Sequence, residues 1–158
     1  MADGPTPSPS PDRIVVGVGA IITRGDRVLL ARRGHPPAEG AWSIPGGRVE
    51  IGETLPAALR REIQEECCLE VTVGDIAILL DRISRRPDGT LTSHYLIVDF
   101  WATAASEHAR AASDATAVGW FTLDEIRQLP TTTNLADYLD QALRRRAAGA
   151  PGCLIVNE

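Results

Sequence analysis

Apolar positions fall in short β-type runs along most of the chain. Residues 14–23 are rich in β-branched side chains, and a turn at 24–26 separates them from a second apolar run at 27–32. This pattern predicts a hairpin. Two longer runs flank a Pro-Asp-Gly turn at 85–89 and predict a second, extended hairpin. The two strands of that second hairpin are predicted at 71–83 and 91–103. Two further short strands are predicted at 42–44 and 117–121.

Three segments show helical signals instead. Residues 54–67 contain no glycine, Thr54 is suited to be the N-cap, and Pro56 falls in the first turn, where its missing N–H costs little. Thr122 to Glu125 form a capping box that opens a short helix ending at Pro130. Residues 134–148 place Leu135, Tyr138, Leu139 and Ala142 on one face and predict the last helix.

Two acids share the apolar stripe of the helix at 54–67. At about 100° per residue, Glu62 and Glu66 lie beside Leu59 and Ile63, so they face the protein. A solvated surface with pairs such as Arg61 and Glu65 is the usual interpretation of a charged helix. It does not explain like charges stacked on the inward side, where repulsion and desolvation both oppose ionisation. A hard divalent cation, Mg²⁺ or Mn²⁺, would offset both costs.

A glycine-containing loop at 44–47 precedes this helix and can bring backbone close to such an ion. Together the loop and helix resemble the Nudix box, G-x5-E-x7-R-E-U-x-E-E-x-G-U with U aliphatic. The residues in register are Gly47, Glu53, Arg61, Glu62, Ile63, Glu65, Glu66 and Leu69. Cys68 stands where the family has its last glycine, and a left-handed conformation there costs about 1 kcal/mol.

The resemblance implies an α/β fold, an α/β/α sandwich with a mixed β-sheet, as in small single-domain members of the MutT type. It also implies Mg²⁺- or Mn²⁺-dependent hydrolysis of a diphosphate bond in a nucleoside diphosphate linked to another group. By the same resemblance, the metal ligands are Glu62, Glu66, the Gly46 carbonyl and Glu65, the last directly or through water. Arg61 orients the carboxylates and Glu53 supports the cluster.

The base that activates water stays open between the box acids Glu62 and Glu65 and the distant Glu107, because position alone does not choose. The substrate is equally open among ADP-ribose, nucleotide sugars and nucleoside triphosphates. A rival interpretation is a nucleotide-binding sensor or interaction module without turnover, but such a module is expected to lose box acids. The candidate substrate-binding residues are Arg32, Arg33, Trp42, Arg82 and His94, with either His94 or Tyr95 bordering the pocket.

Composition limits the partners and the domain organisation. A net charge of −5 disfavours binding to a nucleic-acid polymer, so the expected partner is a small nucleotide. Three cysteines and the lack of an apolar run of membrane-spanning length favour a cytoplasmic protein without membrane contact. We expect a disordered Pro/Ser-rich tail at 1–12, one domain at 13–148 and a tail at 149–158 whose apolar run packs on the body. The sequence leaves open whether the protein forms a homodimer.

Overall fold

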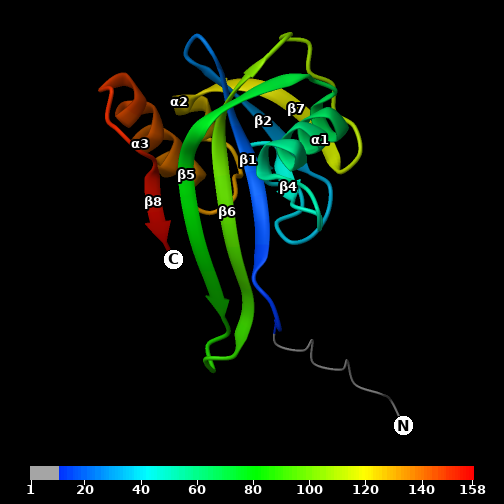
Figure 1. Cartoon of the computed structure of the whole chain (residues 1–158), viewed down its shortest axis with the longest axis vertical. Coiled ribbons are helices and arrows are strands. Elements are labelled where there is room, and N and C mark those ends of the chain that lie inside the picture. Colours follow the sequence, from blue (N-terminus) through cyan, green and yellow to red (C-terminus); the bar gives the residue numbers. More distant parts are fainter. Residues whose placement is uncertain (1–10) are drawn as a thin grey trace.

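The computed structural model describes residues 11–158, so the disorder expected for 1–12 lies almost wholly outside the described residues. The described chain forms one mixed sheet with helices on both sides (Figure 1). In chain order, the elements are β1 Val15–Arg24, β2 Arg27–Arg33, β3 Trp42–Ser43, β4 Gly46–Arg48, α1 Leu55–Cys67, β5 Val71–Arg85, β6 Leu91–Ala104, β7 Ala115–Thr122, α2 Leu123–Ile126, α3 Leu135–Ala147 and β8 Leu154–Asn157.

Strand β1 joins the two parts of the sheet. It runs parallel to β6 along most of its length and antiparallel to β4, whereas it pairs with β2 only near their turn, at Thr23↔Val28 and Arg24↔Arg27. The predicted first hairpin is therefore real but short, because β2 leaves β1 to pair with β7 and β3. The predicted second hairpin is the extended antiparallel pair β5 and β6.

Alternate residues of the strands supply two cores on opposite faces of the sheet. From β1, Ala20 and Ile22 pack toward α1, while Ile21 packs in the core that includes residues of α3. Leu59 and Ile63 are the fully buried anchors of α1. Two faces that are each covered by a helix make three layers, which confirms the predicted α/β/α arrangement.

The helix ends follow their local sequence signals. The Thr54 side chain accepts a hydrogen bond from the Ala57 N–H (3.3 Å) and caps α1. Thr122 and Glu125 form the predicted reciprocal capping box of α2. Cys68 ends α1 in the left-handed conformation, with φ 54° and ψ 38°. Across residues 11–158, each helix is too short or too polar to cross a membrane.

The segment expected to be a C-terminal tail contains an edge strand. Leu154 to Asn157 (β8) pair in parallel with Ile78 to Asp81 of β5, and the Glu158 N–H donates to the Asp81 carbonyl (2.8 Å). The apolar run at 153–156 thus packs on the body, as the sequence predicted. The folded part of the chain extends beyond residue 148, because this edge of β5 has backbone groups that β8 satisfies.

Candidate active site

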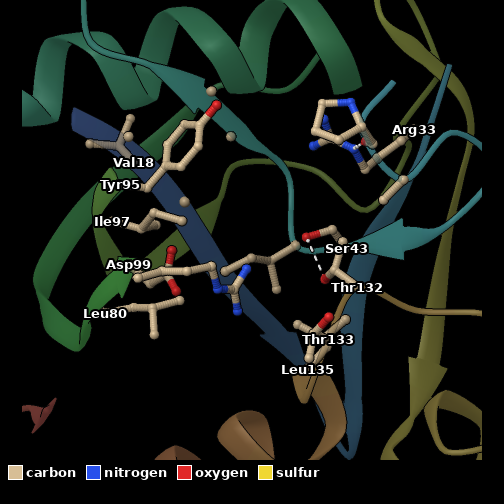
Figure 2. A pocket seen from close by; sticks show the side chains of 18 of the residues that line it. Val18, Arg33, Ser43, Leu80, Tyr95, Ile97, Asp99, Thr132, Thr133 and Leu135 are labelled. Carbon is tan, nitrogen blue, oxygen red and sulfur yellow. Dashed lines mark hydrogen bonds between the residues drawn. The ribbon is translucent and has the colours of Figure 1, made fainter. Parts of the chain in front are cut away.

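A cavity of about 1110 Å³ opens on the α3 side of the sheet and reaches the acids of α1. Figure 2 shows part of its lining, from Tyr95 to Leu135. One end is polar and acidic, and its wall includes Gly46, Gly47, Glu62 and Glu66. The other end has an apolar floor from β5, β6 and α3, beside three polar residues of the lining. The floor residues are Ile78, Leu80, Ile97, Leu135 and Leu139, and the polar residues are Arg82, Asn134 and Glu158. A cavity of this size and mixed lining is suited to a small ligand with one charged end and one flat apolar end.

The acidic end depends on the close approach of β4 to α1. The Gly46 N–H donates to Glu66 Oε2 at 3.1 Å. A Cβ added at Gly47 would lie 2.3 Å from the carboxyl carbon of Glu62, so a side chain here would displace that carboxylate. Glycine is therefore required at position 47 by the space that Glu62 occupies.

The two inward acids, predicted from the helical stripe, are both in an environment that opposes ionisation. Burial, reinforced by the charges of Glu62 and Asp114, raises the pKa of Glu66 to about 7, although the Gly46 N–H and Arg33 act in the opposite direction. Burial also raises the pKa of Glu62, against the lowering effect of Arg61. A site that holds carboxylates in this way favours a cation beside them.

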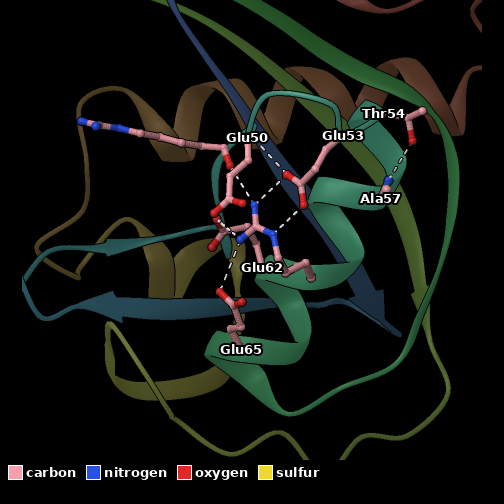
Figure 3. A network of polar contacts seen from close by, with 8 residues as sticks. Glu50, Glu53, Thr54, Ala57, Glu62 and Glu65 are labelled. Carbon is pink, nitrogen blue, oxygen red and sulfur yellow. Dashed lines mark hydrogen bonds and ion pairs between the residues drawn. The ribbon is translucent and has the colours of Figure 1, made fainter.

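The guanidinium of Arg61 contacts the other box acids, of which Glu53, Glu62 and Glu65 are labelled in Figure 3. Its guanidinium donates twice to Glu53, at 2.7 and 2.9 Å, and once to Glu62, at 2.9 Å. Glu65 lies 3.4 Å away on the exposed side of the helix. The hydrogen bonds from Arg61 and from the Glu50 backbone lower the pKa of Glu53 to about 2, which keeps Glu53 ionised. Glu53 and Arg61 thereby fix the orientation of Glu62.

The donor chemistry of this end fits a divalent cation. Glu62 and Glu66 offer hard carboxylate oxygens whose pKa values are raised by burial, and a bound cation would favour their ionised forms. Among residues 11–158, no group of three or more histidine, cysteine, aspartate or glutamate side chains is arranged to hold a metal ion. Glu65 is turned toward Arg61, so it would have to rotate to act as a further ligand.

The five sequence candidates for substrate binding lie in different environments. Arg33 and Arg82 line the cavity, and Arg82 Nε donates to Glu158 at 2.8 Å. Arg32 is exposed, donates to the Gly40 carbonyl and borders a smaller cavity of about 20 Å³ that Glu66 also lines. Trp42 packs edge-on against Phe121 with ring centroids 4.9 Å apart, which is a core contact.

His94, the fifth substrate-binding candidate, and Glu107, the distant candidate for the base, both lie outside the cavity lining. Alternate residues of β6 face the cavity, so Tyr95 lines it while His94 points to the other face, with Nε2 2.9 Å from Asp81 Oδ1. Of the two residues, Tyr95 is therefore the one that borders the cavity. Glu107, the distant candidate for the base, forms an ion pair with Arg24 and is absent from the cavity lining.

Sequence reasoning missed two acids that line the cavity, Asp99 and Asp114. Asp114 acts on the pKa values of both Glu62 and Glu66, and its Oδ1 lies 3.3 Å from His35 Nε2. Asp99 lies on β6 and is 8% exposed. A signal for Asp99 was available, because it is the one charged residue in the apolar run at 96–102, whereas Asp114 sits in a polar loop without any distinguishing pattern.

Comparison with known proteins matches residues 13–143 to the NUDIX domain. The ADP-ribose pyrophosphatase of Methanocaldococcus jannaschii is 32% identical over 114 residues, which cover 72% of this chain and 65% of that protein. The putative 8-oxo-dGTP diphosphatase 2 of Mycobacterium tuberculosis is 51% identical over 65 residues, covering 40% and 44%. The crystal structure of a MutT NUDIX hydrolase from Burkholderia pseudomallei has a TM-score of 0.71 at 32% identity, covering 82% and 98%.

The domain match and the structural similarity agree with the observed fold. The chain spans 65% and 44% of the length of the two curated relatives, whose names specify different substrates. The domain match nevertheless includes the whole sheet except β8, the buried residues of both cores and every acid of the box. The chain therefore belongs to the NUDIX domain family.

Proposed function

We propose that this protein hydrolyses a diphosphate bond in a nucleoside diphosphate linked to another moiety, with Mg²⁺ or Mn²⁺ as cofactor. The observation that supports this proposal best is the Glu62 and Glu66 pair, held beside the β4 glycines at the acidic end of a large cavity. The opposite, apolar end has room for the nucleoside. Such a two-ended site suits a ligand that carries its charge on one side.

Each residue at the acidic end has a distinct proposed part. Glu62 and Glu66 would hold the cation, together with Gly46, and Glu65 would join them after turning away from Arg61. The cation, when bound, would supply charge neutralisation at the phosphoryl group and a more acidic water molecule. Arg61, fixed by Glu53, keeps Glu62 in position. Arg33 lines the same cavity and can contact phosphate oxygens.

The geometry favours a base within the box over the distant alternative. Glu62 lines the cavity, whereas Glu107 is engaged by Arg24 outside the lining. We therefore propose that Glu62, or Glu65 once released from Arg61, accepts the proton from the attacking water. The matched relatives act on ADP-ribose or 8-oxo-dGTP by their names, and both classes contain the bond that this site would cleave.

A substrate panel tests the proposal. ADP-ribose, nucleotide sugars, dinucleoside polyphosphates and nucleoside triphosphates are incubated with Mg²⁺, with Mn²⁺ and with EDTA, and products are measured. We expect cleavage of at least one class with the cation and none with EDTA. Metal-dependent nucleotide binding without any turnover would contradict the proposal and favour the sensor interpretation.

A variant locates the activity in the proposed site. Glu66→Gln should lower turnover about 100-fold or more, because a metal ligand supports several kcal/mol of transition-state stabilisation. The matched control is Glu70→Gln, an exposed position just beyond the same helix. Circular dichroism and thermal unfolding check that both variants fold. Full turnover in folded Glu66→Gln would exclude Glu66 as a ligand.

A further inference from the structure

Asp99 is a buried carboxylate that faces the cavity from the central strand β6. It lies next to Ile97 and Leu80 on the apolar floor (Figure 2). A Cβ added at Gly19 would lie 2.3 Å from Asp99 Oδ1, so the carboxylate rests directly on the backbone of β1. The sequence thus provides space for an acid where the other floor residues are aliphatic.

This carboxylate has no hydrogen-bond donor or ion-pair partner among residues 11–158 of the structure. The positive charge of Arg82 lowers the pKa of Asp99, but Arg82 Nε itself donates to Glu158 at 2.8 Å. A carboxylate that is 8% exposed and lacks a partner is costly to ionise, because burial removes most of its water without a replacement. Neither oxygen has a donor from the described protein, so a ligand in the cavity can supply N–H groups to this carboxylate.

Asp99 and the acidic end lie at different points of one cavity. Gly19 of β1 pairs with both Gly46 of β4 and Asp99 of β6, so Asp99 lies two strands away from β4. Asp99 repels phosphate when it is ionised, whereas a cation held by Glu62 and Glu66 would attract phosphate, so the phosphates of a nucleotide belong at the Glu62 and Glu66 end. The moiety that reaches Asp99 must be flat enough for an apolar floor and must carry hydrogen-bond donors.

We propose that Asp99 is a specificity-determining residue that accepts hydrogen bonds from a nucleobase with two adjacent N–H donors, as on the guanine edge. The N1–H and the 2-amino group of guanine match the two oxygens of one carboxylate. Adenine and cytosine present an acceptor beside their amino group and would leave one oxygen facing a lone pair. The inference rests on the proposed function, since it assumes that the cavity takes a nucleotide.

The test compares guanine with hypoxanthine nucleotides, which differ only in the 2-amino group. The ratio of kcat/KM for GTP to that for ITP is measured for the wild type and for Asp99→Asn, or for the corresponding diphosphate-linked substrates if those are cleaved instead. We expect a ratio of about ten or more in the wild type, from one hydrogen bond to a charged group. Asp99→Asn should bring it close to one, mainly through KM.

Two controls separate recognition from folding. Asp75→Asn makes the same chemical change at an exposed position of β5 and should keep the wild-type ratio. The ratio within one variant is independent of how much of that variant is folded. Calorimetric binding of GMP and IMP repeats the comparison without turnover, so it tests Asp99 even if no substrate is hydrolysed.

The outcomes distinguish the two proposals. If the wild type binds GMP more tightly than IMP and Asp99→Asn does not, Asp99 recognises the base whether or not turnover occurs. If turnover is metal-dependent but the GTP to ITP ratio is the same in both proteins, this inference is overturned and the proposed function stands. A wild-type preference for adenine or cytosine nucleotides also overturns it.

Discussion

Cys68 adopts a backbone conformation that disfavours any side chain with a Cβ. It ends α1 at φ 54° and ψ 38°, and its N–H donates to the Gln64 carbonyl at 3.1 Å. The Nudix pattern has glycine at this position, where the left-handed region carries no steric cost. The side chain is half-buried and lies outside the cavity lining, so the cost falls on stability.

Cys68→Gly should stabilise the protein by about 0.5–1 kcal/mol. The relief of left-handed strain exceeds the extra freedom that glycine gives the unfolded chain. Urea unfolding of the wild type, Cys68→Gly and Cys68→Ala measures the effect. The alanine variant keeps the strain and removes only the thiol. Equal stability of the glycine and alanine variants would show that the backbone conformation is not the cause.

At the scale of elements, the site is a contact between a helix and a short strand. β4 contains two glycines and pairs with β1 at Gly17, Val18 and Gly19, which places its backbone against the inward face of α1. The box spacing makes this contact possible, because residues 49–54 return the chain to the start of the helix. Two acids one turn apart on α1 then meet the strand side by side.

Gly47→Ala should disturb this contact without unfolding the protein. The added methyl group would lie within 2.4 Å of both carboxylate oxygens of Glu62, so that side chain must move away from the proposed cation position. We expect kcat/KM to fall about tenfold or more, with a higher metal concentration needed for half-maximal rate. Gly17→Ala is the control, since its nearest contact would be an ordinary 3.4 Å. Equal activity of the two variants would contradict the assigned contact.

Local signals predicted the elements well, and non-local pairing limited the rest. The cap at Thr54, the capping box at Thr122 and the turn between β5 and β6 each depend on neighbours in sequence, and each occurs as predicted. The parallel pairing of β8 with β5 joins segments more than 70 residues apart, so no local pattern indicates it. The pairing of β1 with β6 and of β2 with β7 also joins segments far apart in the sequence, so no local pattern indicates it.

The same division applies to the cavity. Glu62 and Glu66 were predicted because their stripe lies within one helix. Asp99 was missed because Gly19, on another strand, provides the space for its carboxylate. Among the predicted substrate residues, Arg33 and Arg82 reach the cavity, whereas strand parity directs His94 away from it. Sequence therefore located the acidic end and left the apolar end undescribed.

At the scale of the whole molecule, the cavity concentrates negative charge in a protein with a net charge of −5. Glu62, Glu66 and Asp99 all have pKa values raised by burial, so ionisation of these groups lowers the stability of the fold. A cation at one end and N–H donors at the other would each remove part of that cost. Ligand binding should thus stabilise the fold.

Asp99 gives this cost a measurable pH dependence. Burial raises its pKa from 3.8 to about 7, despite the opposing charge of Arg82. The folded state therefore binds the proton more tightly than the unfolded state, so the wild type loses stability as pH rises from about 4 through 7. Above that range the cost is fully present, and below it the cost is absent.

Asp99→Asn should remove this loss. Relative to the wild type, the variant should gain on the order of 2–4 kcal/mol in unfolding free energy between pH 4.5 and pH 8.5. Urea unfolding of both proteins in EDTA at the two pH values measures the gain, and the contribution of Glu66 cancels in the comparison. Asp75→Asn should track the wild type at both pH values. A difference between wild type and Asp99→Asn that stays constant with pH would show that Asp99 ionises as easily in the folded protein as in the unfolded chain.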